Sequence, residues 1–212
     1  MGLTGICIGL ARRIRTGCWL VLAALARVMP QQRKRDARPV LVVLRPDAIG
    51  DYILFRPWLR WLREASPWAG WKIVLAGNTV WRGFALDFDS GCFDEALWLD
   101  RRRLMQSPLY FFAVARRLRR LRPVLLIYPV VSRELLGDLL VRASRAGQAI
   151  AAECDGINLE PRFARRSDRW YTRLVPVAAR GFEFYRTRDF FGGLCAGLQP
   201  DFPRDSRIDH AA

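Results

Sequence analysis

The chain has 212 residues, enough for one domain of ordinary size, and it is 51% hydrophobic and 12% aromatic. This composition predicts a packed core and excludes a largely disordered chain. The net charge of +15 would suit a nucleic-acid-binding protein. However, Lys34 and Lys72 are the only lysines among the 35 basic residues, and genome base composition alone can produce such a skew. No nucleic-acid-binding motif is present, so we expect no nucleic-acid partner.

The amino-terminal segment is predicted to form a basic, amphipathic helix followed by a linker, together covering residues 1–38. The apolar run over 17–29 is shorter than the roughly 20 residues that span a bilayer. Basic residues flank both of its ends, and no small-residue cleavage site follows, which argues against a signal peptide. We favour a helix on an anionic membrane surface. A helix docked on the protein and an artefactual extension are the alternatives.

From Pro39 onwards, strand-like and helix-like stretches alternate. The expected strands are 40–44, 71–77, 95–100, 123–129 and 148–152, and the expected helices are 52–65, 79–86, 109–121, 133–144 and 182–198. Continuously apolar strands separated by helices indicate a parallel sheet that is covered on both faces. We therefore predict an α/β, Rossmann-like domain over residues 39–198, followed by a tail over 199–212.

The five cysteines are far apart and form no C-x-x-C pair, which disfavours both a zinc site and a disulfide framework. Free thiols in a reducing cytoplasm are the simplest interpretation. The one histidine, His210, lies in the polar tail, so any acid–base catalysis must depend on carboxylates.

The stretch RPDAIGD, residues 45–51, forms a tight corner between the first expected strand and helix. Ligands of such sheets bind beyond the carboxyl ends of the strands. Gly50 would let backbone approach a ligand, and Asp51 stands at the start of the helix. Aspartate is also a favoured N-cap, and spacing alone favours that role for Asp51. Pro57 is expected to kink or restart the helix.

A longer pattern surrounds this corner. The segments LVVLRPDAIGDYILFRPWLRWLREA, WKIVLAGN, FDEALWLD and YTRLVPV occur in this order. Together they resemble glycosyltransferase family 9, the ADP-heptose:lipopolysaccharide heptosyltransferases and their relatives, over residues 39–198. The resemblance implies a B-type glycosyltransferase with two Rossmann-like domains facing a cleft. The first domain would bind a lipopolysaccharide or related glycan acceptor, and the second would bind the nucleotide-sugar.

For this chain, the resemblance implies the acceptor-binding half of such an enzyme, at the cytoplasmic face of the inner membrane. Sugar transfer in the family inverts the anomeric centre without a metal, and we expect no cofactor. Asp51 holds the position of the family's proposed general base, which outweighs the capping interpretation. Because the chain ends soon after the last expected helix, the nucleotide-sugar would need a second domain. The alternatives are a non-enzymatic binding module or split-gene fragment and, less favoured, a basic nucleic-acid-binding protein.

Further candidate residues follow the expected strands. Together with Gly50, the predicted acceptor-binding residues are Arg45, Asn78, Ser132 and Arg133. Asp155 and Asn158 follow the fifth strand and are weaker candidates, since such residues also cap turns.

Two patterns of charged residues have simpler explanations. Asp87 and Asp89 match the D-x-D pattern that holds a divalent cation in other glycosyltransferases, but so short a pattern is common by chance. Residues 101–103 and 116–122 are rich in arginine and could meet acceptor phosphates or anionic lipid. A solvated helix face is the interpretation we favour for them.

Overall fold

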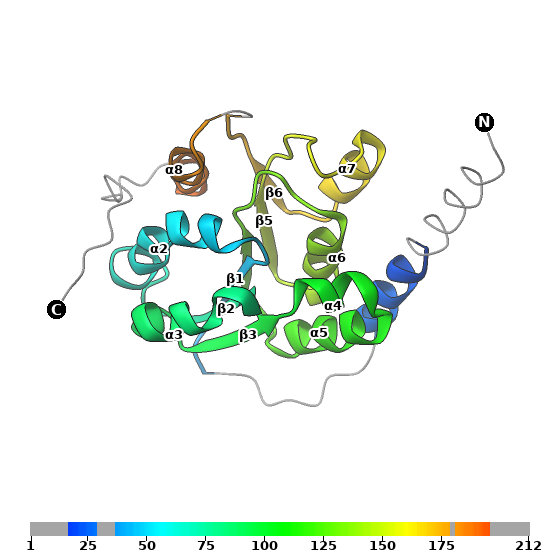
Figure 1. Cartoon of the computed structure of the whole chain (residues 1–212), viewed down its shortest axis with the longest axis horizontal. Coiled ribbons are helices and arrows are strands. Elements are labelled where there is room, and N and C mark those ends of the chain that lie inside the picture. The colour runs from blue at the N-terminus through cyan, green and yellow to red at the C-terminus, as the bar shows by residue number, and fades with distance from the viewer. Residues whose placement is uncertain (1–16, 29–36, 179–180, 196–212) are drawn as a thin grey trace.

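A computed structural model of the chain describes residues 17–28, 37–178 and 181–195. A six-stranded, all-parallel sheet lies at its centre (Figure 1). The strands are β1 (Val40–Arg45), β2 (Lys72–Asn78), β3 (Glu95–Leu99), β4 (Leu125–Tyr128), β5 (Gln148–Ala152) and β6 (Arg173–Val175). The predicted α/β, Rossmann-like fold is confirmed. The expected tail over 199–212 and most of the expected linker lie outside the described residues.

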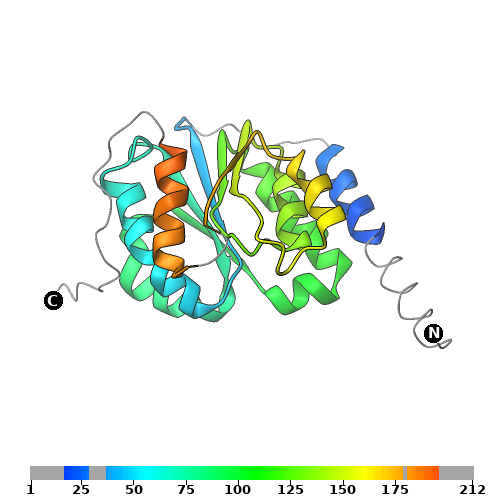
Figure 2. The same cartoon turned by 90° about the horizontal axis from the view of Figure 1, so that it is seen from above.

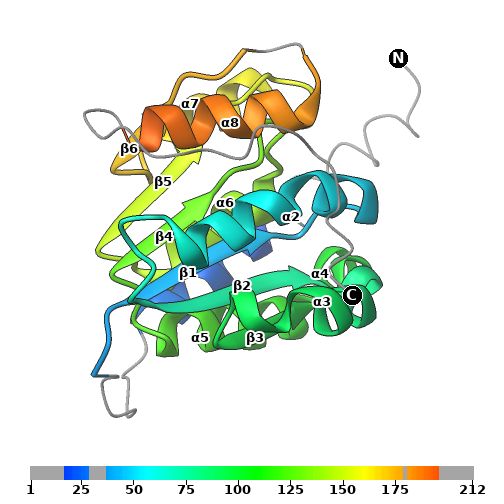
Figure 3. The same ribbon diagram turned by 90° about the vertical axis from the view of Figure 1, so that its left-hand side faces the viewer.

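Helices cover both faces of this sheet (Figures 2 and 3). One face carries α2 (Ile49–Glu64), α3 (Arg82–Asp89) and α8 (Glu183–Leu194), and the other carries α4 (Arg101–Gln106), α5 (Pro108–Arg120) and α6 (Leu135–Ser144). Helix α7 (Pro161–Asp168) contacts α6, and two 3-10 turns, η1 (Thr79–Trp81) and η2 (Ser90–Cys92), flank α3. Each face has its own hydrophobic cluster, as the continuously apolar strands require.

The order of the strands defines where a ligand can bind. The strands lie in the order β3-β2-β1-β4-β5-β6. Strands β2 and β3 extend the sheet to one side of β1, and β4 to β6 extend it to the other, so the direction of winding reverses between β1 and β4. Val43 of β1 lies opposite Ile127 of β4 in the parallel register. In doubly wound sheets, the loops that follow the two strands at such a switch point diverge and leave a crevice at the carboxyl edge.

Helix α2 runs without interruption through Pro57, so the helix does not restart there as one of the two expectations had it. The side chains beside the proline explain this continuity, because Phe55, Trp58 and Leu59 are fully buried. Trp58 stacks on Phe191 of α8 with 5.2 Å between the ring centroids. Burying these large apolar side chains offsets the roughly 3 kcal/mol that a proline costs inside a helix.

Besides the short turn η2, three of the described elements were not predicted. Residues 101–106 form α4, whose N-cap is Asp100: its side chain accepts a hydrogen bond from the Arg103 backbone N–H at 2.9 Å. Helix α7 and strand β6 occupy the stretch between β5 and α8, and β6 lies within the YTRLVPV segment.

The amino-terminal helix, residues 17–28, packs on the outside of the α5–α6 layer (Figure 2). Trp19, Ala23 and Ala26 are buried, and the ring of Trp19 meets Phe111 of α5 edge-on at 5.3 Å. Arg119, near the end of α5, donates a hydrogen bond of 2.8 Å to the carbonyl of Ala26. The structure thus docks this helix on the protein. Within the described ranges, no helix has the length and apolar character needed to cross a membrane.

Candidate functional site

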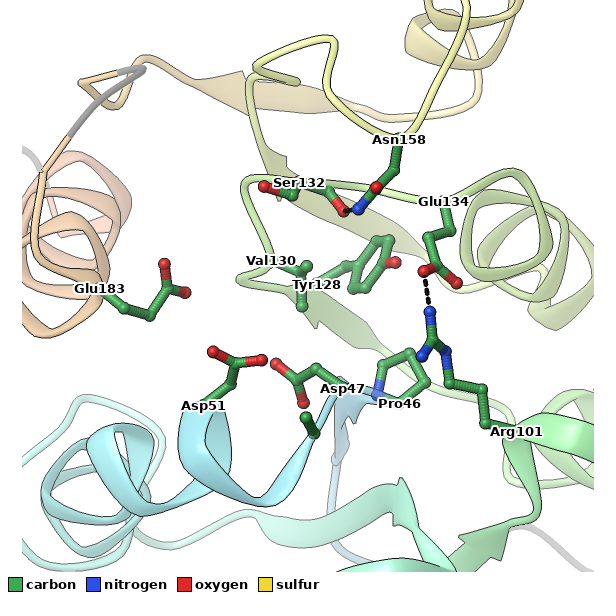
Figure 4. Close-up of a pocket in the computed structure, with 11 residues that line it drawn as sticks. Pro46, Asp47, Asp51, Arg101, Tyr128, Val130, Ser132, Glu134, Asn158 and Glu183 are labelled. Atoms are coloured by element: carbon green, nitrogen blue, oxygen red, sulfur yellow. Dashed lines mark hydrogen bonds and ion pairs between the residues drawn. The ribbon is translucent and has the colours of Figure 1, made fainter.

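A cavity of about 170 Å³ opens at the carboxyl edge of the sheet, at the switch point between β1 and β4 (Figure 4). Segments far apart in the sequence contribute to its wall. The lining residues are Pro46, Asp47, Ala48, Asp51, Arg101, Tyr128, Val130, Ser132, Glu134, Asn158 and Glu183. Four of these side chains are acidic and one is basic, so the cavity is rich in carboxylates although the chain as a whole is strongly cationic.

Asp51 points into this cavity from the first turn of α2 (Figure 4). The helix begins at Ile49 with Ala48 as its N-cap, and no side chain caps it. Asp51 is therefore the third residue of the helix, and the capping interpretation was wrong. A carboxylate in a first turn is still favoured by the helix dipole. The Asp51 carboxylate forms no hydrogen bond or ion pair with any described residue, so it is available to a ligand.

Asp47 lies beside Asp51 and carries a perturbed carboxyl group. Burial raises the pKa of Asp47 to about 6, against the lowering effect of Arg45, which forms an ion pair with it at 2.6 Å. The negative charges of Asp51 and Glu183 raise it further. The second carboxylate oxygen, Oδ1, is buried and has no hydrogen-bond partner among the described residues.

Glu183 faces the two aspartates across the cavity (Figure 4). As the first residue of α8, it enters the site from the carboxyl end of the described chain. Burial raises the pKa of Glu183, while Arg45 and Arg186 oppose the shift and Asp51 adds to it. Glu183 was not predicted as a site residue from the sequence. Its only signal was an acid at the start of the last expected helix, on the same edge of the sheet.

Ser132 lines the cavity on the side of β4 and is fixed by two residues of the β5–α7 loop. Its hydroxyl donates to Asp155 at 2.5 Å, and its carbonyl accepts from the Asn158 side chain at 3.0 Å. Burial would raise the pKa of Asp155, but hydrogen bonds from Ser132, the Ile157 backbone N–H and Arg186 lower it. Asp155 therefore stays ionised and holds Ser132 in place.

Two predicted acceptor contacts on the β1–β2 side turn inwards. Arg45 is fully buried: it pairs with Asp47 and donates to the carbonyls of Pro129, at 2.9 Å, and Asp51, at 3.1 Å. Asn78 is also buried, and its amide donates to the Asp47 carbonyl at 3.1 Å. Neither side chain lines the cavity. Both were expected to touch the acceptor, but their contacts make them supports of the loop that carries Asp47 and Asp51.

Arg133 likewise lies behind the cavity wall. Its side chain is fully buried and forms ion pairs with Asp138, at 3.5 Å, and with Asp168 of α7. Tyr171 contributes its ring face to the guanidinium at 4.8 Å and donates a hydrogen bond to Asp138 at 2.5 Å. The expected contact with an acceptor is thus replaced by an internal network that anchors the loop carrying Ser132.

Gly50 precedes Asp51 in the first turn of α2 but is not among the residues that line the cavity. It is exposed and helical, and a Cβ built on it would meet no atom within 4 Å. The backbone conformation here does not require glycine.

The remaining charged patterns lie apart from this cavity or at its rim. Asp87 is exposed on α3, whereas Asp89 is buried and accepts from Arg56 and the Tyr52 hydroxyl, each at 2.7 Å. The two carboxylates of the D-x-D pattern therefore do not share one site. Arg101 lies at the rim and forms an ion pair with Glu134 (Figure 4).

The arrangement as a whole can accept protons and hydrogen bonds. The negative charges of Asp51 and Glu183 raise the pKa of Asp47, and the charge of Asp51 raises the pKa of Glu183. Such a group suits a ligand that presents hydroxyls. In the part of the chain that the structure describes, no group of three or more histidine, cysteine or acidic side chains has the geometry to hold a metal ion.

Comparisons of this chain with models of known protein families, with curated proteins and with solved structures found no match.

Proposed function

We propose that this protein is the acceptor-binding part of a heptosyltransferase-like glycosyltransferase, acting on a lipopolysaccharide or related glycan acceptor in the cytoplasm. The observation that carries the proposal is the Asp51 carboxylate, which has no partner among the described residues and faces a cavity at the switch point of the sheet. Asp51 lies at the edge of the sheet where ligands bind in this fold. It also belongs to the corner RPDAIGD, residues 45–51, within the segments that resemble the family.

The proposed reaction uses Asp51 as a general base. An acceptor hydroxyl in the cavity donates a hydrogen bond to the Asp51 carboxylate. The oxygen of the acceptor hydroxyl then attacks the anomeric carbon of the nucleotide-sugar. The bond from that carbon to the diphosphate oxygen breaks, and the hydroxyl proton passes to Asp51. The nucleotide diphosphate leaves with the electron pair. A positioned base of this kind contributes about 10²–10⁴-fold in rate.

Asp47 and Glu183 would support this proton transfer without touching the reacting atoms. Burial is the main reason why the pKa of each is raised, and the negative charge of Asp51 raises both further. A proton taken up by Asp51 would remove its negative charge from beside the other two carboxyl groups.

The charge of the cavity also bears on which part of the acceptor enters it. Ionised carboxylates accept hydrogen bonds from sugar hydroxyls but repel phosphate groups. We therefore place a neutral, hydroxyl-rich sugar ring in the cavity. Any acceptor phosphates would stay outside it, near the exposed arginines of α4, Arg101 and Arg102.

The binding half of the proposal can be tested by filling the cavity. Ala48 lines it and is exposed, so Ala48→Trp should block the mouth without disturbing the core. Calorimetric titration with a deacylated lipopolysaccharide inner-core oligosaccharide should show binding by the wild type and loss of binding in this variant. Ala113→Trp, at an exposed alanine of α5 outside the cavity, is the matched control. Equal binding by both variants, or no binding by the wild type, would reject the proposed site.

A further inference from the structure

The amino-terminal helix has a second apolar face, opposite the one that docks on α5. Val21, Leu25 and Val28 are 58%, 48% and 72% exposed. Their spacing of four and three residues places them on one side of the helix. The buried residues Trp19 and Ala23 lie on the other side.

A helix that is apolar on both sides is normally covered on both sides. Here the sheet-facing side packs against the α5–α6 layer, and no described residue covers the outward side (Figure 2). We define the outward residues Val21, Leu25 and Val28 as the apolar stripe.

Arg27 is exposed on the same helix as the apolar stripe, and Arg119 of α5 donates a hydrogen bond to the carbonyl of the neighbouring Ala26 at 2.8 Å. Burial lowers the pKa of Arg142, and the positive charges of Arg27 and Arg166 lower it further. The pKa of Arg119 is lowered by burial first and then by Arg145 and Arg27. These guanidinium groups are thus close enough to repel one another.

Within the described ranges, none of Arg27, Arg142, Arg145 and Arg166 forms an ion pair with a carboxylate. The cluster would be stabilised by an anionic partner.

We propose that the apolar stripe and these arginines form a docking surface for an anionic lipid bilayer. The stripe would enter the boundary between headgroups and acyl chains, with the helix lying in the plane of the interface. The arginines would then meet anionic headgroups, each contributing about fivefold to the affinity.

The charge cluster argues against a second copy of this chain as the occupant. A two-fold interface brings the same patch of both subunits together. Arg27 and its neighbours would then face an identical set of arginines, and the repulsion would double.

The stripe can be tested with variants that keep charge and helix propensity. Val21→Gln/Leu25→Gln removes two of its apolar side chains. Val80→Gln/Leu86→Gln is the matched control, because these residues are 71% and 41% exposed and belong to η1 and α3, on the other face of the sheet. Sedimentation with vesicles of phosphatidylglycerol and phosphatidylcholine in equal parts should show at least about tenfold weaker binding for the first pair. The control pair should bind like the wild type.

The charges are tested by a second matched set. Arg27→Gln/Arg145→Gln should weaken binding to the same vesicles about twentyfold or more, at about fivefold per arginine. Arg82→Gln/Arg188→Gln removes the same charge from exposed positions on α3 and α8 and should have little effect. Vesicles of phosphatidylcholine alone should bind the wild type poorly, and added salt should release it from the anionic vesicles.

Several outcomes would overturn the proposal. These are equal binding to both kinds of vesicle, equal losses in test and control pairs, and a wild-type dimer in gel filtration that Val21→Gln/Leu25→Gln dissociates. Circular dichroism spectra and melting temperatures close to those of the wild type would show that each variant folds.

Discussion

Asp47 should give this protein a pH-dependent stability whose sign and size follow from its surroundings. Burial, with the charges of Asp51 and Glu183, raises the pKa of its carboxyl from 3.8 to about 6 despite the ion pair with Arg45. Between these values the folded chain binds more protons at this carboxyl than the unfolded chain does. The contribution of Asp47 to the free energy of unfolding therefore falls as the pH rises from about 4 to about 6.

The size of this fall follows from the shift. About two pKa units correspond to about 3 kcal/mol. Asp94 acts in the opposite direction and at lower pH. Burial would raise the pKa of Asp94, but hydrogen bonds from Arg63, the Ile73 backbone N–H and Arg38 lower it from 3.8 to about 2. The stabilising effect of Asp94 is therefore lost only as the pH falls from about 4 to about 2.

Asp47→Asn isolates the effect, because asparagine does not titrate. Urea unfolding of wild type and variant at pH 4, 5, 6 and 7 gives the difference between their free energies of unfolding, in which the other titrating groups cancel. We expect the wild type to lose up to about 3 kcal/mol relative to the variant across this range. The exposed Asp87→Asn should give no such trend. Parallel pH curves for wild type and Asp47→Asn would refute the reasoning.

Two further predictions concern packing and a buried ion pair. Trp19→Ala should lower the free energy of unfolding by about 3 kcal/mol in urea unfolding, because Trp19 is 4% exposed at the docked face, whereas Val21→Ala on the outward face should cost under about 0.5 kcal/mol. Equal costs would contradict the docking. Asp89→Asn should cost about 3–5 kcal/mol, because it leaves the buried Arg56 without its charged partner, while Asp87→Asn should be close to neutral. A neutral Asp89→Asn would show that the pair is not buried in solution.

Much of the fold could be predicted from apolar runs. Both ends of each of the five expected strands fall within two residues of the corresponding ends of an observed strand. Strand β6 was missed because it has three residues, Arg173–Val175, of which only Val175 is buried. Helix α4 was missed because Arg101–Gln106 is short and buries only Leu104, so its arginines resembled a solvated charge run.

The start of α2 shows why local signals can misplace a boundary. Aspartate is favoured both at the N-cap and within the first turn, so Asp51 alone could not distinguish these positions. The observed N-cap is Ala48, whose side chain cannot accept a hydrogen bond. The restart expected at Pro57 did not occur for a related reason. The free energy that a proline costs inside a helix is outweighed by core contacts formed with helix α8, which is distant in the sequence.

The location of the candidate site could be predicted from the sequence, but the directions in which its side chains point could not. The rule that ligands bind beyond the carboxyl ends of parallel strands led to Asp51 and Ser132, which line the cavity. It led equally to Arg45 and Arg133, which are fully buried. Whether an arginine at a strand end faces solvent or an internal carboxylate depends on tertiary partners. Glu183 was missed because its role arises only when α8 packs beside α2.

The measurement that tests the central proposal most directly is the rate of sugar transfer by Asp51→Asn, with a nucleotide-sugar-binding domain supplied in trans or by fusion. Asparagine keeps the size of the side chain but cannot take a proton as the carboxylate does. We expect the rate to fall about 10²–10⁴-fold while the melting temperature stays within a few degrees of the wild type, with Asp87→Asn as the active control. A near-normal rate for Asp51→Asn would contradict the assignment of Asp51 as the general base.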